Sequence, residues 1–197
     1  MLTQRGVTMI EVLVALLILT IGLLGVAGLQ ARMQSAQVEA FQRAQAIVLM
    51  QDMVDRINAN RRNAANYATG GTPLGTGDSP ASDCTTLSTV AARDNCEWSK
   101  ALTGASETKV SGGVTNKLGA MNAARGCIEV TVATMPREVL VSVVWQGIVP
   151  TVVPGGTSCG SGNSDYGSDG KLRRAMIARI KIGCLQNDPT TGACVTP

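Results

Sequence analysis

Hydrophobic and polar positions divide the chain into an apolar N-terminal stretch, a periodic stretch and several short alternating stretches. Residues 12–29 contain no charged side chain, and residues 7–10 extend the apolar stretch to 23 residues with Glu11 as its one interruption. About 20 apolar residues in a helix cross the hydrocarbon core of a bilayer. The N-terminal pattern therefore predicts a membrane-spanning half-helix over residues 7–30.

The stretch after Leu29 has apolar residues at spacings of three, four and seven, which is typical of an amphipathic helix. We expect one continuous helix over residues 7–58, with residues 31–60 as its amphipathic half. Asparagine and arginine residues at 58–63 favour its termination. The apolar positions assigned to the amphipathic face are Met33, Ala36, Ala40, Phe41, Ala44, Ile47, Val48, Val54 and Ile57.

Residues 61–126 show no sustained periodicity and read as a variable loop region containing a short helix near residues 83–102. Alternating patterns over residues 127–133, 138–146 and 174–182 then predict three strands with one buried face. The short turn near Pro136 makes the first two strands antiparallel. Together these patterns predict an α+β fold, in which the outer half of the long helix packs on a small antiparallel sheet within residues 127–197.

The chain has six cysteines, an even number, and they are widely spaced without a Cys-x-x-Cys pair. This pattern favours disulfides over a zinc site. Their positions in the expected elements suggest three bonds that each close a modest loop. The predicted pairs are Cys84–Cys96, Cys127–Cys159 and Cys184–Cys194.

Composition removes several functional classes. The chain has no histidine and shows no nucleophile motif, so we expect no catalytic residues, no metal and no cofactor. Aromatic residues make up 3% and the net charge is +3, which does not favour contact with nucleic acid.

Between strands two and three lies a glycine-rich surface loop over residues 155–170. Whether its Asn163, Asp165 and Asp169 bind calcium, or the loop contacts a partner, stays open.

Glu11 is the informative residue of the apolar segment. An acidic side chain in a membrane helix costs about 2.5–3.5 kcal/mol on insertion scales, so it implies either a partner or a position near the surface that reaches water. A cleaved secretory signal would have a shorter apolar core. A plain membrane anchor fits the length but leaves Glu11 unexplained.

The segment Gln4-Arg5-Gly6-Val7-Thr8-Met9-Ile10-Glu11-Val12-Leu13-Val14-Ala15 resembles the processing and assembly motif of type IV pilins and pseudopilins. The resemblance implies a leader of residues 1–6 that prepilin peptidase removes between Gly6 and Val7. It also implies N-methylation of Val7, where the family usually has Phe, and a role in assembly and register for Glu11, the fifth mature residue.

The stretch GLLGVAGLQARMQSAQ, with GC-x-EV and VSVVWQG further on, resembles the PilV-type minor pilins, or pilus modification proteins. This implies a single-pass protein of the bacterial inner membrane with a periplasmic C-terminal domain, later incorporated into an extracellular pilus. The implied partners are other minor pilins and the major pilin, met through the N-terminal helix, together with prepilin peptidase and the inner-membrane assembly platform.

The implied function is pilus assembly or initiation, serving twitching motility, adhesion or DNA uptake. Two alternatives stay open. One is a minor pseudopilin of a type II secretion system, which the N-terminus alone does not separate from a pilin. The other is a membrane-anchored periplasmic enzyme, disfavoured because histidine and any readable carboxylate pair are missing.

Overall fold

The computed structural model describes residues 6–105, 108–117, 121–133, 136–184 and 190. The chain divides into two compact units, residues 1–41 and 42–197, and helix α1 contributes to both. The described elements are α1 (Met9–Ala59), η1 (Arg61–Tyr67), β1 (Leu74–Gly75), η2 (Cys84–Thr86), α2 (Val90–Leu102), β2 (Thr108–Ser111), β3 (Val114–Lys117), β4 (Arg125–Val132), β5 (Arg137–Gln146), η3 (Ser164–Tyr166) and β6 (Arg173–Ile182).

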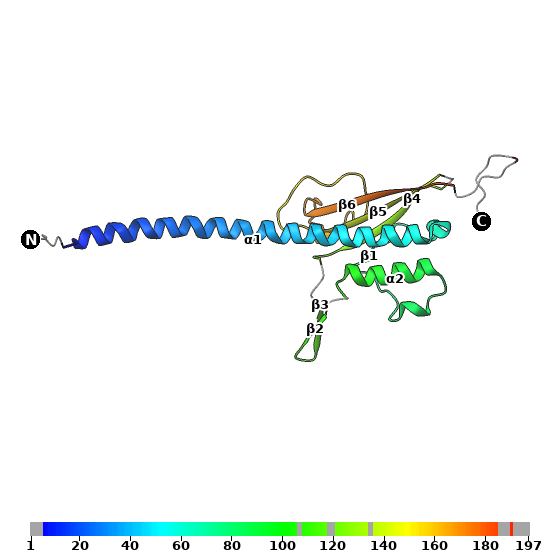
Figure 1. Cartoon of the computed structure of the whole chain (residues 1–197), viewed down its shortest axis with the longest axis horizontal. Helices are drawn as coiled ribbons and strands as arrows, with labels where there is room; N and C mark the ends of the chain where they lie inside the picture. The colour runs from blue at the N-terminus through cyan, green and yellow to red at the C-terminus, as the bar shows by residue number, and fades with distance from the viewer. Residues whose placement is uncertain (1–5, 106–107, 118–120, 134–135, 185–189, 191–197) are drawn as a thin grey trace, which may run out of the picture. The chain divides into compact units, whose positions relative to one another are not determined.

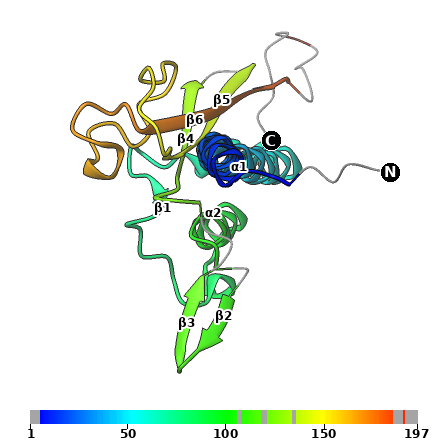
Figure 2. The same ribbon diagram turned by 90° about the vertical axis from the view of Figure 1, so that its left-hand side faces the viewer.

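The main sheet of the second unit has four antiparallel strands in the order β1-β4-β5-β6. Strand β5 pairs with β6 over its whole length, from Arg137 opposite Ile182 to Gln146 opposite Arg173. The three strands expected from alternating patterns are confirmed within two residues at each end. The part of α1 that belongs to this unit lies along the sheet, with α2 on the other side of the helix (Figures 1 and 2).

The buried stripe of α1 only partly matches the predicted one. The fully or largely buried positions include Ala46, Met53 and Ile57, and Leu49 packs against the same core. Their spacings of three, four and seven follow one helix face. By contrast, Phe41 and Val48, both assigned to the buried face, are 61% and 67% exposed. Of the predicted positions, Ile57 is buried and Val54 packs against the core. The outer half of α1 is therefore amphipathic as expected, but most of its predicted buried face is exposed.

Strand β5 is buried on both faces, so the prediction of a single buried face is wrong for this strand. Val139, Val141 and Val143 contact the core shared with α1, while Val144 on the opposite face packs against Tyr166 and the bond between Cys127 and Cys159. The segment after β5 folds back over this second face and covers it.

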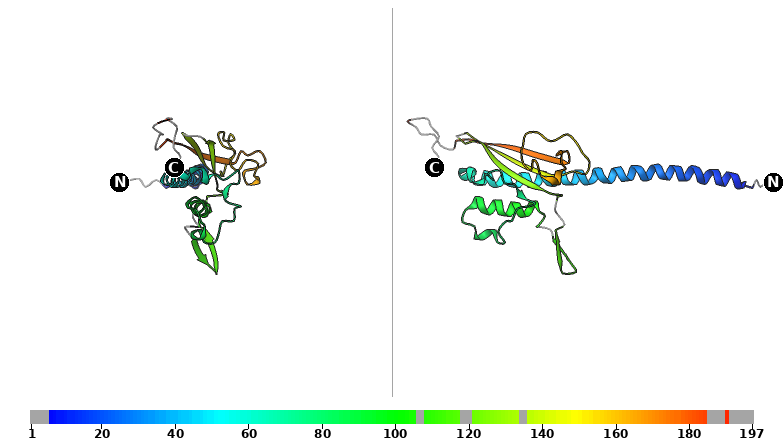
Figure 3. Two further views of the ribbon diagram at one scale, coloured as in Figure 1. Left: turned by 90° about the vertical axis from the view of Figure 1, so that its right-hand side faces the viewer. Right: turned by 180° about the vertical axis from the view of Figure 1, so that it is seen from behind.

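The region between α1 and β4 contains more structure than its sequence pattern indicates. Strand β1 joins the sheet edge, and β2 and β3 form a separate two-stranded hairpin around Gly112 and Gly113 (Figure 3). Helix α2 begins at Val90, where the Thr89 hydroxyl accepts the N–H of Ala92. A side-chain cap of this type satisfies one of the first free N–H groups and so determines the start of the helix.

Helix α2 is joined to α1 by an ionic network. The Arg56 guanidinium contacts Asp52, Asp94 and Glu97 at 2.7–3.0 Å, and the Tyr67 hydroxyl donates to Asp94. Burial lowers the pKa of Arg56, but its hydrogen bonds to the three carboxylates outweigh burial and raise it overall. Burial, followed by the hydrogen bond to Asp94, raises the pKa of Tyr67 to about 12. At neutral pH Arg56 therefore stays charged and Tyr67 stays a neutral hydrogen-bond donor.

Candidate processing and assembly site

The predicted cleavage point lies just outside the first helix. Gly6, Val7 and Thr8 are not helical, and α1 begins at Met9. The Thr8 carbonyl accepts the N–H groups of Glu11 and Val12 at 3.1 and 3.3 Å, which closes the first turn. Val7 is 72% exposed, so the bond between Gly6 and Val7 is accessible and free of helical hydrogen bonding.

The fold of this chain does not itself require glycine at position 6. A Cβ built on Gly6 meets no atom within 4 Å, and its backbone has no positive φ. The same open space surrounds Gly22, Gly25 and Gly28 inside α1. Any requirement for glycine at these positions must therefore come from other molecules, such as a processing enzyme or close helix neighbours.

Glu11 lies in the first turn of α1. The N-terminal turn of a helix carries free N–H groups and partial positive charge, which favours a carboxylate by about 0.3–1 kcal/mol in exposed sites. That gain is smaller than the cost of about 2.5–3.5 kcal/mol for an acidic group in an apolar membrane helix. Among the described residues, the Glu11 side chain forms no hydrogen bond or ion pair. The geometry thus leaves its carboxylate available to another molecule.

The apolar segment that follows is not covered by any of the residues that the structure describes. Fifteen large apolar side chains from Val7 to Leu29 are between 48% and 82% exposed. The helix is long and apolar enough to cross a membrane, and its most apolar window has no buried residue. An apolar surface of this extent is stable only in lipid or against other apolar surfaces.

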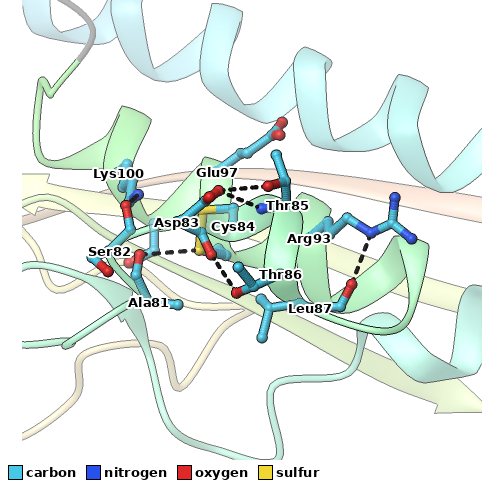
Figure 4. The surroundings of a disulfide bond; sticks show 12 residues. Ala81, Ser82, Asp83, Cys84, Thr85, Thr86, Leu87, Arg93, Glu97 and Lys100 are labelled. Atoms are coloured by element: carbon cyan, nitrogen blue, oxygen red, sulfur yellow. Dashed lines mark hydrogen bonds between the residues drawn. A yellow bond between two sulfur atoms is a disulfide. The ribbon is translucent and has the colours of Figure 1, made fainter.

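Two of the three predicted disulfides are present. The α2 disulfide, Cys84–Cys96, ties η2 to α2, and the β4 disulfide, Cys127–Cys159, ties β4 to the segment after β5. Cys184 is also disulfide-bonded, while its predicted partner Cys194 lies outside the described residues. Next to the α2 disulfide, Asp83 accepts two hydrogen bonds from Thr85, and the Lys100 ammonium donates to the Ser82 carbonyl (Figure 4).

The three calcium candidates of the glycine-rich loop are engaged elsewhere. Asp165 pairs with Arg125 at 2.6 Å, and Asp169 pairs with Lys171 at 3.0 Å. The Asn163 side chain caps η3. In the described part of the chain, no group of three or more acidic or cysteine side chains is placed to hold a metal.

Comparisons with known proteins agree with the N-terminal geometry. Residues 1–27 match the prokaryotic N-terminal methylation motif, and residues 28–102 match the family described as Type IV pilin Tt1218. Residues 1–102 are those of a type IV pilin. No match was found among curated proteins or among solved structures.

The two matches cover the pilin's membrane helix, its ionic network and the whole of α2. Gly6, Val7 and Glu11 all lie within the matched methylation motif. The family is structural rather than enzymatic, and the protein is a subunit of the pilin or pseudopilin type. Its long helix packed on a small antiparallel sheet, with two disulfides, is the fold expected of a type IV pilin domain.

Proposed function

We propose that this pilin is a minor subunit of a type IV pilus, of the PilV type, that supports pilus assembly or initiation. In this proposal prepilin peptidase cuts the exposed bond between Gly6 and Val7, and the new amine of Val7 is methylated. The subunit then moves from the inner membrane into the filament, where it meets other minor pilins and the major pilin. The proposal depends most on Glu11, which lies at the start of an exposed apolar helical segment and has no hydrogen-bond or ion-pair partner among the described residues.

The orientation in the membrane follows from charge and redox chemistry. Arg5 is the basic residue before the apolar segment, and basic residues favour the cytoplasmic side. The disulfides lie after the segment, and disulfides persist in oxidising compartments such as the periplasm. The leader is therefore cytoplasmic and the second unit periplasmic in this proposal, where the inner-membrane assembly platform can collect the subunit.

Glu11 provides the axial register between subunits. Cleavage exposes a positive amine on Val7, and in a bundle of parallel apolar helices the amine of one subunit can approach Glu11 of the next. Opposite charges attract strongly where water is excluded, and the pairing removes the cost of an isolated carboxylate. An apolar helix surface alone does not specify axial position, so this pair selects one register.

The test compares Glu11→Ala and Glu11→Gln with Asp55→Ala, which removes an exposed carboxylate from the same helix outside the apolar segment. All three variants should insert, be cleaved after Gly6 and keep their disulfides. Both Glu11 variants should fall at least about tenfold in the sheared-filament fraction on immunoblots, since losing a desolvated charge pair costs more than about 1.4 kcal/mol. Wild-type levels of Glu11→Ala in filaments would refute the register mechanism.

A deletion strain separates the pilus role from the alternative role in type II secretion. Loss of surface pili with normal protein export supports the proposal. Normal pili with failed export of secreted enzymes would identify a pseudopilin. Mass spectrometry of the membrane-bound protein should show a chain that begins at Val7, and an intact Met1 terminus would contradict processing.

A further inference from the structure

The segment between β5 and β6 is held in place by several polar contacts. The Gly147 N–H donates to the Leu172 carbonyl at 2.7 Å, and the Thr151 N–H donates to the Lys171 carbonyl at 2.9 Å. The β4 disulfide fixes its middle. Within this segment lies a cavity of about 220 Å³. That space suits a small ion or a single sugar ring.

Arg173, the first residue of β6, lines this cavity and is only 5% exposed. Its guanidinium donates to the carbonyls of Pro154, Thr157 and Cys159, which uses three of its five N–H groups. Among the described residues, no further acceptor meets its Nε–H or its second Nη2–H, and no carboxylate lies within ion-pair distance. These two donors form part of the guanidinium fork that binds oxyanions in bidentate fashion.

The neighbouring buried arginine is different. Arg125 is 6% exposed, but it pairs with Asp165 at 2.6 Å and donates to the Tyr166 hydroxyl at 3.1 Å. Burial lowers its pKa, and these two hydrogen bonds more than compensate and raise it. A buried cation normally has such an anionic partner, because burial of a lone charge is costly. The carbonyl oxygens around Arg173 satisfy hydrogen bonds but do not neutralise its charge.

Other groups at the cavity also favour an anion. The exposed hydroxyls of Ser161 and Ser168 line it and, within the described part of the chain, form no hydrogen bond. Asp169 also lines it, but its two oxygens accept the N–H of Lys171 and pair with the ammonium of the same residue. The charged residues in the cavity lining are Arg173 and Asp169, and the charge of Asp169 is offset by its ion pair with Lys171.

We propose that this cavity binds a small oxyanion group, a carboxylate or a phosphate, with Arg173 as its charged donor and Ser161 and Ser168 as hydroxyl donors. Such groups occur both as free ions and on acidic polysaccharides. The cavity lies in the region after Leu102, outside the family matches, and its use does not depend on the pilus role. The site belongs to the second unit of the chain itself.

The test is calorimetric titration of the full chain in neutral detergent at low ionic strength, with inorganic phosphate, glucuronate and neutral glucose as probes. We expect binding of phosphate or glucuronate with a dissociation constant of about 1 mM or tighter, weakened by salt, and no binding of glucose. Phosphate binding alone would identify a phosphoryl ligand. Glucuronate binding alone would identify an acidic sugar.

The variants separate binding from folding. Ser161→Ala with Ser168→Ala changes only exposed hydroxyls, and should weaken binding about tenfold while thermal unfolding stays unchanged. Arg173→Lys keeps the charge but loses the fork, and should abolish measurable binding. Arg62→Gln, an exposed arginine elsewhere in the same unit, is the control and should bind as the parent does. Absent binding of both anions, equal binding of glucose, or unchanged binding in the double serine variant would overturn the proposal.

Discussion

The contact between Gly126 and Trp98 offers a sharp test of how the second unit is packed. Trp98 of α2 is fully buried, and its indole N–H donates to the Leu49 carbonyl of α1 at 2.8 Å. A Cβ added to Gly126 of β4 would lie 2.2 and 2.4 Å from the Cη2 and Cζ3 atoms of the same indole. Gly126→Ala therefore forces the ring to move by more than about 1 Å, and overpacking of this kind costs about 1–3 kcal/mol.

A double-mutant cycle isolates this contact. Trp98→Phe removes the two clashing ring atoms and the hydrogen bond to α1, and should cost about 2–4 kcal/mol by itself. In that background the remaining close neighbour of the added Cβ is the Leu102 Cδ1 atom at 2.9 Å, the end of a flexible side chain that can rotate, so the cost of Gly126→Ala should fall below about 1 kcal/mol. We therefore expect a coupling free energy of about 1–2 kcal/mol between the two positions.

The assay is urea unfolding of the full chain in detergent, followed by far-ultraviolet circular dichroism and by fluorescence of Trp145. Trp145 lies in the same core and is kept in all four proteins. Gly155→Ala is the matched control, because a Cβ there meets nothing within 4 Å and should change stability by less than about 0.5 kcal/mol. Additive costs of Gly126→Ala and Trp98→Phe would show that the indole does not exclude a side chain at position 126.

Two further predictions concern covalent and ionisable groups of the second unit. Alanine replacement of both cysteines of the β4 disulfide opens a 32-residue loop and should lower the free energy of unfolding by about 3.7 kcal/mol. The same change at the α2 disulfide opens a 12-residue loop and should lower it by about 2.8 kcal/mol. The opposite order in urea unfolding would contradict this estimate. The pKa of Tyr67, raised to about 12 by burial and then by its hydrogen bond to Asp94, contributes stability that is complete below pH 10 and is lost as pH rises to about 12. Tyr67→Phe should lack this part of the alkaline loss, about 2–3 kcal/mol, and an unchanged pH profile would refute the assignment.

The sequence was sufficient for the elements whose pattern is local. Alternation over residues 138–146 predicts β5 because alternate side chains are apolar, and the same holds for β4 and β6. The Cys127–Cys159 bond followed once the strand ends were placed, since both cysteines were expected at the same end of the sheet. The processing motif was equally local, because Gly6, Val7 and Glu11 lie within six residues of one another.

Features that depend on contacts distant in sequence were not predicted. Strand β1 has only two residues, and it exists because Leu74 and Gly75 pair with β4 about fifty residues later. The cavity beside Arg173 has no sequence signature, since the carbonyl partners of Arg173 come from a segment 14–19 residues earlier.

The hairpin of β2 and β3 did carry a signal in the sequence that was not used. Gly112-Gly113 between two short polar stretches is typical of a two-residue turn.

The misplaced face of α1 has a physical cause that bears on assembly. An apolar periodicity in sequence does not tell which neighbour covers each position, and this helix has apolar residues on more than one side. Ala46, Met53 and Ile57 are covered by the sheet and α2 of the same chain. Phe41 and Val48, seven residues apart on another side, stay exposed. One side of the helix thus stabilises the subunit. The other side exposes apolar residues beyond the apolar N-terminal segment, and neighbouring subunits of a filament would cover them.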